Sequence, residues 1–483
     1  MKNAVQLIVY PDSIGGDIKE LSSILNDYFS SVFAGLHILP FYPSAGDRGF
    51  SPLTYFDVEP TFGTWDDIKA LGNKYDILAD IMVNHISGKS ELLSDFLENG
   101  ESSPYKDFFI TLDKIWSDGR VNQDDIDQMF LRRVKPYSTY PSVAFGEKTL
   151  WTTFGREEVS EQVDLDVRSP VVRKYFEDIF AHFSQNNINI VRLDAVGYVI
   201  KKLGTSCFFV EPDIWEFMDW IAELAKKHSI ILLPEVHSHY SMQLKLSEKG
   251  FWIYDFILPY RILEAILTQN SSHLAKYLKT RPHKQFTMLD CHDGIPMKPD
   301  LDDVVTSEDA QKIIDICLER GANLSKIVSE KHKGENGFDV HQIRGTYYSM
   351  LDSDDNAYIV ARALQLFTPG IPQIYYVGLL AGENDYERVA ETGEGREINR
   401  QNYSRRQVHQ ALEKPVVKRL LALIKFRNEY DVFDGKFEII ATNDTIQLCW
   451  EKEILKAVLK VDLKVMTARI TYTQNNEEMR IKL

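Results

Sequence analysis

The sequence has little cysteine, no excess of positive charge and no long hydrophobic run. Its four cysteines lie far apart among 483 residues, with no CxxC pair and no histidine cluster at zinc-ligand spacing. This spacing argues against a disulfide scaffold and against a zinc site. No segment approaches the roughly 18 uninterrupted apolar residues of a membrane span, and the first apolar run is too short for a signal peptide. We therefore expect a cytoplasmic protein that does not associate with a membrane.

The net charge is strongly negative. The chain carries 71 acidic residues against 55 Lys and Arg residues, which gives −16 at pH 7. Non-specific binding to nucleic acid or to an anionic membrane depends on positive charge, so neither partner is expected. An anionic ligand must instead be held by a local basic cluster. The hydrophobic fraction of 44% and the charged fraction of 26% are typical of a globular chain with a sizeable core.

Eight short apolar segments recur along the chain, separated by amphipathic helical patterns. Each segment is continuously apolar, as expected of parallel strands that are buried on both faces. Eight such strands alternating with helices predict an α/β fold, the (β/α)8 TIM barrel. The expected strands are residues 5–10, 35–42, 75–85, 188–196, 230–236, 251–258, 285–290 and 371–378.

The sequence also marks where several helices begin. Ser169 followed by Pro170 predicts a helix start, and Thr64 with Asp67 predicts a capping pair. Asp213 is expected to open a third helix, because apolar residues with helical spacing follow it.

Two intervals between expected strands are too long for simple loops, so each is expected to form an inserted subdomain. After about residue 431 the pattern changes to short alternating segments, which predict a small all-β C-terminal domain. The expected division is barrel segments 1–85, 168–293 and 355–430, inserted subdomains 86–167 and 294–354, and a C-terminal β domain 431–483.

Polar side chains follow the expected strands at their carboxyl ends, where a barrel of this kind places its active site. Three carboxylates at three strand ends suit glycoside chemistry, as nucleophile, proton donor and stabiliser of an oxocarbenium-like transition state. A lone charged residue at a strand end is more often a salt bridge or a helix cap, but three in matching positions argue against that interpretation. The strand-end residues are Asn84, His85, Arg192, Asp194, Glu235, His237, Asp290, His292 and Asp293.

Four segments resemble the conserved segments of the α-amylase superfamily, glycoside hydrolase family 13. They are DIMVNH (80–85), VRLDAVGY (191–198), LPEVHSHY (233–240) and LDCHDG (289–294). Further segments, among them GLHILPFYPSAGDRGFSP and GREINR, resemble the sucrose phosphorylase branch. The similarity spans nearly the whole chain.

The resemblance implies a retaining double displacement, in which phosphate attacks a β-glucosyl–enzyme and releases α-glucose 1-phosphate. It implies that Asp194 is the nucleophile, Glu235 the general acid/base and Asp293 the transition-state stabiliser. Neither a metal nor a cofactor is expected. The implied substrate-binding residues are Asp47, Phe50, His85, Gln162, Arg192, His292, Asp339, Gln342 and Arg396.

One difference from ordinary sucrose phosphorylases concerns phosphate. Ordinary sucrose phosphorylases resemble the motif DxYQ at residues 339–342 of this chain, which has His341 in place of the Tyr. The first insertion adds Arg132 and Arg133. Together with Lys298, these residues resemble the sucrose 6′-phosphate phosphorylases, whose acceptor site must hold a phosphorylated fructose. An acidic protein needs such a focused basic cluster to bind a phosphomonoester. We therefore predict that these four residues bind phosphate.

Several alternatives stay open at this point. If Arg132 and Arg133 are a solvated pair and His341 a neutral loop residue, the chain is a plain sucrose phosphorylase. A glucosylglycerate phosphorylase would need a carboxylate site, and an amylase-type hydrolase would use water and often a structural calcium. A non-catalytic binding protein should have lost triad members. The expected partners are small-molecule substrates, and the expected state is a monomer or homodimer.

Overall fold

The computed structural model describes residues 1–326, 340–475 and 477–483. These residues fall into two compact units, each described by itself. Unit 1 contains residues 1–37 and 237–326 together with the described residues from 340 onward, and unit 2 contains residues 38–236. Among the helices in these ranges, none is long and apolar enough to cross a bilayer.

The central sheet has eight strands in the order β10-β11-β15-β1-β2-β3-β8-β9. Pairs such as β3–β8, β8–β9 and β1–β15 are parallel, and the strands are almost entirely buried. Each of the eight apolar segments contributes one strand, so the predicted (β/α)8 barrel is confirmed. The strands are β1 (Gln6–Val9), β2 (Gly35–Ile38), β3 (Asp76–Met82), β8 (Ile188–Asp194), β9 (Ile231–Pro234), β10 (Ile253–Asp255), β11 (Gln285–Thr287) and β15 (Ile371–Tyr375).

The helix starts follow the predicted local chemistry. Ser169 caps α6 with Pro170 as its first residue, and the Thr64 and Asp67 side chains form a reciprocal capping box on α2. Helix α7 begins at Asp213 as predicted, although its cap residue, Pro212, makes no side-chain capping bond. The longer helices are α1 (Ile18–Tyr28), α2 (Trp65–Gly72), α6 (Pro170–Gln185), α7 (Asp213–Lys227), α8 (Tyr240–Glu248), α9 (Leu258–Thr268), α10 (Ser272–Thr280), α13 (Asp355–Phe367), α16 (Arg405–Leu412) and α17 (Pro415–Glu429).

The first long interval builds small elements in unit 2. Strands β4 (His85–Ser87) and β7 (Gln162–Asp164) pair antiparallel, as do β5 (Tyr137–Ser142) and β6 (Gly146–Trp151). A separate apolar cluster includes the stacked rings of Trp116 and Trp151. The helices of this interval are α3 (Glu91–Asn99), α4 (Leu112–Ile115) and α5 (Gln123–Ile126).

The described residues of the second long interval belong to unit 1. They include α11 (Ser307–Glu319), α12 (Tyr347–Met350) and a three-stranded sheet in the order β12-β14-β13. The strands of this sheet are β12 (Ile295–Pro296), β13 (Asn323–Lys326) and β14 (Val340–Arg344), and the short helices that follow β15 are α14 (Tyr376–Leu379) and α15 (Tyr386–Thr392).

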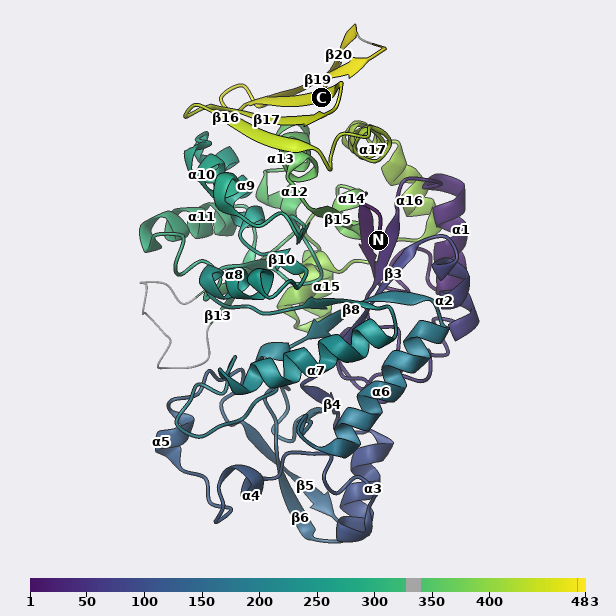
Figure 1. The fold of residues 1–483 in the computed structure, drawn as a ribbon, viewed down its shortest axis with the longest axis vertical. Coiled ribbons are helices and arrows are strands. Elements are labelled where there is room, and N and C mark those ends of the chain that lie inside the picture. The colour runs from purple at the N-terminus through teal and green to yellow at the C-terminus, as the bar shows by residue number, and fades with distance from the viewer. Residues whose placement is uncertain (327–339, 476) are drawn as a thin grey trace. The chain divides into compact units, whose positions relative to one another are not determined.

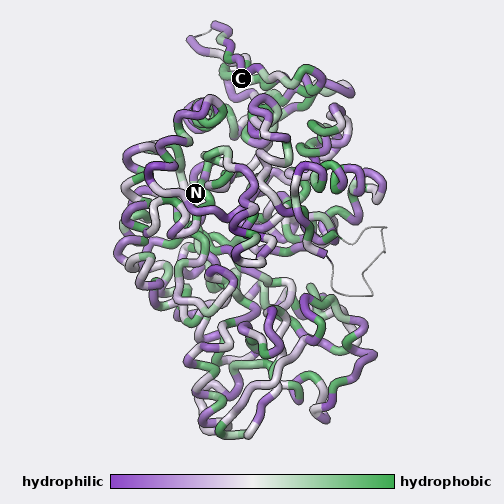
Figure 2. Tube along the Cα trace, turned by 180° about the vertical axis from the view of Figure 1, so that it is seen from behind, coloured by the Kyte–Doolittle hydropathy of each residue, from purple (hydrophilic) through white to green (hydrophobic). Residues whose placement is uncertain are grey.

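The predicted all-β C-terminal domain is confirmed as a five-stranded antiparallel sheet, yellow in Figure 1. Hydropathy alternates along its strands (Figure 2), and the Trp450 indole donates to the Phe367 carbonyl at the end of α13. The six-part division drawn from the sequence stays a prediction. The strands are β16 (Lys436–Ala441), β17 (Thr445–Lys452), β18 (Leu455–Asp462), β19 (Thr467–Gln474) and β20 (Glu477–Lys482).

Candidate active site

One arginine holds two carboxylates at the ends of adjacent strands in unit 2. Arg192 Nη1 lies 2.9 Å from Asp194 Oδ1, and Arg192 Nη2 lies 2.8 Å from Glu235 Oε1. The Ala195 backbone N–H donates to the other Glu235 oxygen at 3.1 Å. The side chains of Asp194 and Glu235 are 13% and 11% exposed, so both carboxylates are mostly buried but still reachable. The parallel register of β8 and β9 places both residues at the same edge.

Asp80 supports this arginine and was not among the predicted site residues. It lies on β3 in register with Arg192, is fully buried, and accepts from Arg192 Nη1. A buried guanidinium needs such compensation, because an unpaired buried charge is costly. The signal was present in the DIMVNH segment, which begins with this aspartate.

Phe50 is held by two other predicted site residues. Its carbonyl accepts from His85 Nε2 at 3.0 Å and from Gln162 Nε2 at 3.2 Å, while Arg192 lies over its ring. Gly49, with φ of 103°, precedes it in a conformation that disfavours a side chain. Burial lowers the pKa of His85 despite the nearby Asp164 carboxylate. The His85 imidazole is therefore neutral and donates from Nε2.

Asp47 and Asn84 have different partners in the same unit. Asp47 lies 3.8 Å from the half-exposed Arg156. Asn84 donates to Asp164, and its amide oxygen accepts from Lys201 Nζ at 2.8 Å. Asn84 is thus part of a buried structural network beside the strand ends.

Asp293 in unit 1 is surrounded by positive charge. Arg396 Nε lies 3.4 Å from Asp293 Oδ1, Arg400 Nη2 lies 3.8 Å from the same atom, and His292 Nε2 lies 3.9 Å from Oδ2. Burial would raise the pKa of Asp293, but Arg396, His292 and Arg400 outweigh it and hold the pKa well below its usual range. The carboxylate is therefore ionised. Arg400, whose Nε–H also donates to the His292 carbonyl at 2.8 Å, was missed although it ends the GREINR segment.

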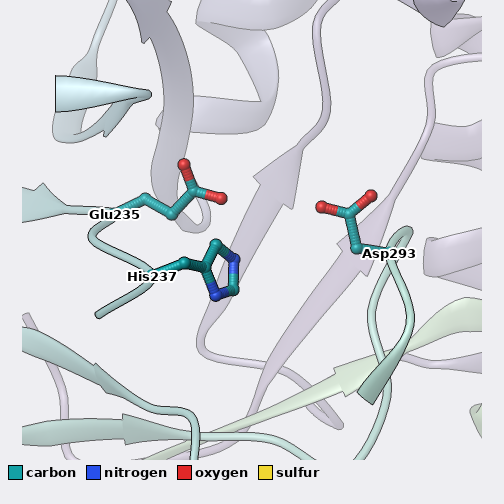
Figure 3. Close-up of side chains that lie close together, drawn as sticks. All are labelled: Glu235, His237 and Asp293. Carbon is teal, nitrogen blue, oxygen red and sulfur yellow. The ribbon is translucent and has the colours of Figure 1, made fainter. Parts of the chain in front are cut away.

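His237 also belongs to unit 1 and follows Glu235 by two residues on the segment after β9 (Figure 3). Its Nδ1 lies 3.2 Å from both carboxylate oxygens of Asp300, and its ring stacks on Phe256. Asp300 is buried, so it favours the tautomer that carries the proton on Nδ1. His237 also lowers the pKa of Asp293, a smaller effect than that of the two arginines.

The predicted phosphate residues of unit 1 lie beside His237. The ring centroids of His237 and His341 are 6.1 Å apart, and His341 Nδ1 donates to the Lys298 carbonyl at 2.8 Å. The Lys298 and Gln342 side chains are also buried, and within the described part of the chain the Gln342 amide oxygen has no hydrogen-bond partner. Asp339 lies outside the described residues.

The two predicted arginines of unit 2 differ in their contacts. Arg133 donates to Ser138 and Thr152 side chains and to the carbonyls of Glu157 and Glu158. Its guanidinium therefore orders the segment before β7. Arg132 instead lies 6.0 Å from the Phe154 ring centroid, and that ring packs on His85.

One strand-end carboxylate has a structural partner. Asp290 receives two hydrogen bonds from Arg362 Nη2, at 2.8 and 2.7 Å, and both side chains are buried. Asp290 therefore forms a structural salt bridge, the alternative given above for a lone charged residue at a strand end.

Comparison with known proteins adds the following relationships. Residues 10–291 match the alpha-amylase family, specifically its catalytic domain. The chain is 55% identical over 483 residues to a sucrose 6(F)-phosphate phosphorylase of Thermoanaerobacterium thermosaccharolyticum, covering 99% of both chains. It is 40% identical over 479 residues to a sucrose phosphorylase of Streptococcus mutans, covering 98% of both. A crystal structure of sucrose 6F-phosphate phosphorylase from Thermoanaerobacter thermosaccharolyticum matches with a TM-score of 0.99 at 55% identity, covering 100% of this chain and 99% of that one.

Proposed function

The chain belongs to the alpha-amylase family, and on this basis we propose that it is a retaining hexosyl-transferring phosphorylase. The proposed reaction converts sucrose 6′-phosphate and inorganic phosphate into α-glucose 1-phosphate and fructose 6-phosphate. The observation that carries the chemistry is the pair of carboxylates, Asp194 and Glu235, bound to one guanidinium. The proposed donor, sucrose 6′-phosphate, is the one in the name of the relative that is 55% identical and covers 99% of both chains.

In the first half-reaction Asp194 attacks the anomeric carbon while Glu235 gives its proton to the leaving glycosidic oxygen. Arg192, 2.9 Å from Asp194, favours the ionised nucleophile, whereas its 2.8 Å contact with Glu235 must be released before that carboxyl group carries the proton. A β-glucosyl–enzyme forms and fructose 6-phosphate leaves.

In the second half-reaction inorganic phosphate attacks the same carbon, and Glu235 accepts the proton that phosphate loses. Two inversions give α-glucose 1-phosphate, so the configuration of the donor is retained. Asp293 stabilises both oxocarbenium-like transition states, a role that requires the ionised form which its cationic neighbours favour. All three carboxylates follow strands of the one eight-stranded sheet.

The glucosyl ring is assigned to Asp47, Phe50, His85, Gln162, Arg192 and His292, and the acceptor side to Asp339, Gln342 and Arg396. Phosphate is assigned to Arg132, His341 and Lys298. Arg133 contributes through the four hydrogen bonds that order its segment. The protein is expected to act in the cytoplasm, without cofactor, as a monomer or homodimer.

The decisive experiment measures glucose 1-phosphate release from sucrose and from sucrose 6′-phosphate side by side. Two or three charge-assisted hydrogen bonds to the donor phosphate predict a preference of about 10²-fold in kcat/KM for the phosphorylated donor. Equal efficiency would leave a phosphorylase of plain sucrose, and release of free glucose without phosphate would indicate a hydrolase.

His341→Tyr restores the residue of ordinary sucrose phosphorylases and should erode the preference while sparing turnover of sucrose. His239→Tyr is the matched control, because the His239 side chain is 54% exposed and pairs only loosely with Asp302. A preference that is unchanged in His341→Tyr would count against the assigned phosphate residue and leave the reaction class intact.

A further inference from the structure

Helix α13 is buried along most of its length, yet it carries a charged side chain in its interior. Every residue from Ala357 to Phe367 is buried, and Arg362 is 0% exposed. Burial would lower the pKa of Arg362, but the Asp290 carboxylate outweighs burial and raises it, so the guanidinium is charged. A buried ion pair seldom adds stability, since well-packed apolar side chains in its place are often as stable or more stable. Stability alone therefore does not account for this pair.

Three polar side chains on one face of α13 connect this helix to two barrel strands. Tyr358, Arg362 and Gln365 follow one another at helical spacing. Arg362 Nη1 donates to Gln365 Oε1 at 2.9 Å, and Arg362 Nε and Nη2 donate to the Tyr358 hydroxyl. Gln365 Nε2 in turn donates to the carbonyls of Thr287 on β11 and Gln373 on β15. Arg362 is therefore the centre of a buried network that spans both strands.

Arg362 also holds the segment that carries two of the proposed active-site residues. Its Nη2 lies 2.8 and 2.7 Å from the two oxygens of Asp290, which precedes His292 and Asp293 on the segment after β11. The pair is tightly enclosed, because a Cβ on Gly378 in α14 would lie 2.1 Å from both Arg362 Nη2 and Asp290 Oδ2. The start of the segment is thus fixed against α13 and α14.

The next two residues of the segment are held by their backbone carbonyls. Asn399 Nδ2 donates to the Cys291 carbonyl at 3.0 Å, and Arg400 Nε donates to the His292 carbonyl at 2.8 Å. Residues 290–292 are therefore each held by a side chain from another part of the chain, directly before Asp293. Catalytic groups must be placed to within about 0.5 Å, and a displacement of about 1 Å can lower the rate by about 10²-fold.

We infer that Arg362 and Asp290 are positioning residues, whose ion pair holds the Asp293 carboxylate where the oxocarbenium-like charge develops. The inference rests on the proposed function, in which Asp293 stabilises the transition state. It explains why a buried helix keeps an arginine: charge-assisted hydrogen bonds are directional and fix a geometry, whereas apolar contacts do not. The structural salt bridge of Asp290 thus has a functional consequence.

The test removes both charges at once, because loss of one would leave the other buried and unpaired. In Arg362→Met/Asp290→Leu apolar groups fill the space of the pair. With the better of the two sucrose donors, kcat should fall about tenfold while KM stays within about twofold, because Asp293 acts in the transition state. Thermal unfolding confirms that the variant is folded at the assay temperature.

Arg261→Met/Glu264→Leu is the matched control. Arg261 and Glu264 are also a buried ion pair on a helix of unit 1, with Nη1 2.7 Å from Oε2. Their other side-chain bonds go to the Val304 carbonyl and to His273, outside the segment 290–294. This variant should leave kcat within about twofold of the unmutated protein.

A double-mutant cycle separates positioning from a general weakening of the fold. Asp293→Asn is made in the unmutated protein and in Arg362→Met/Asp290→Leu. It should lower kcat by about 10²-fold or more in the unmutated protein, and by about tenfold less in the variant, where the carboxylate is already misplaced. Equal effects of Asp293→Asn in both backgrounds, or normal kcat in Arg362→Met/Asp290→Leu, would overturn the inference.

Arg362→Lys enters the same cycle and decides the matter if the double variant does not fold. Lysine keeps the buried charge but lacks the rigid fork that also reaches Tyr358 and Gln365, so kcat should again fall and Asp293→Asn should again cost less. The cycle also tells two failures apart. If Asp293→Asn leaves turnover of the unmutated protein unchanged, the proposed role of Asp293 is wrong and the inference fails with it. If Asp293→Asn lowers turnover but the pair variants turn over normally, only the positioning role is wrong.

Discussion

At the scale of the residue, Asp194 carries the clearest expectation. Asp194→Asn keeps the shape of the side chain but removes the nucleophilic charge, so kcat should fall by about 10³-fold or more. The fold should persist, because the amide can occupy the same position beside Arg192. Steady-state kinetics and thermal unfolding check both statements. Asp178→Asn, on an exposed helix face beside Lys174, is the control that should change neither. Normal turnover in Asp194→Asn would refute the assignment of the nucleophile.

The pKa of Asp293 predicts how activity and stability depend on pH. Its pKa is depressed by Arg396, His292 and Arg400 against the effect of burial, so its charge stabilises the fold above the unfolded-state pKa of about 3.9. That contribution is lost only as the pH falls through the lower folded-state pKa. Arg400→Gln removes one cation and should raise the pKa of Asp293. The acid limb of kcat/KM and of thermal stability should then move to higher pH.

Arg405→Gln is the matched control for this shift. Arg405 forms an exposed ion pair with Asp27, so its loss should leave the acid limb in place. If the acid limb moved equally in both variants, the loss of one positive charge anywhere on the protein would explain the shift. The surroundings of Asp293 would then not set the pH dependence.

At the scale of the element, local chemistry made the starts of helices predictable. Ser169 with Pro170, and Thr64 with Asp67, act within one turn of chain, so their pattern is visible in the sequence. Residues whose partner lies on another strand were not visible in this way. Asp80 supports Arg192 across 112 positions, and only the register of β3 with β8 reveals the pair.

The loop before Phe50 offers a test at this scale. Gly49 has φ of 103°, and a Cβ there would lie 2.7 Å from the Pro40 carbonyl oxygen. Gly49→Ala should displace the Phe50 carbonyl that His85 and Gln162 hold, and so lower kcat/KM. Gly146→Ala is the control, since Gly146 also has positive φ (74°) but open space around its Cβ position. Equal kinetic effects would show that backbone strain alone, and not the position of Phe50, is responsible.

At the scale of the whole molecule, the barrel and the C-terminal sheet were predictable because their apolar periodicities are long. The motifs also named most of the candidate site, since its residues cluster at the ends of strands. The sequence could not predict which charged groups serve the site and which form structural ion pairs or hydrogen bonds. Asp290 is committed to Arg362 and Arg133 to its own segment, and such pairings depend on the folded geometry.

Whether the chain needs a structural metal, which an amylase-type hydrolase often carries in its first insertion, also depends on pairings that form only in the folded protein. Three oxygens, from Asn84, Asp164 and Tyr198, converge on the buried ammonium of Lys201, which lies 2.7 Å from Asp164 Oδ2 and 2.8 Å from Asn84 Oδ1. Such hard oxygen ligands are those that calcium prefers. Here the Lys201 ammonium, a cation that belongs to the chain itself, lies among these oxygens and neutralises the Asp164 carboxylate.

Exhaustive chelation should therefore leave both turnover and the thermal midpoint of the unmutated protein unchanged. Lys201→Met leaves the Asp164 carboxylate without its buried partner, so the protein should lose about 3–5 kcal/mol of stability. Lys202→Met, the neighbouring exposed lysine paired with Asp213, should lose little. Unfolding with and without chelator, followed for all three proteins, separates the outcomes. If chelation inactivated the unmutated protein and calcium restored it, the expectation of metal-independent activity would be wrong, and the protein would depend on a metal held elsewhere than at Lys201.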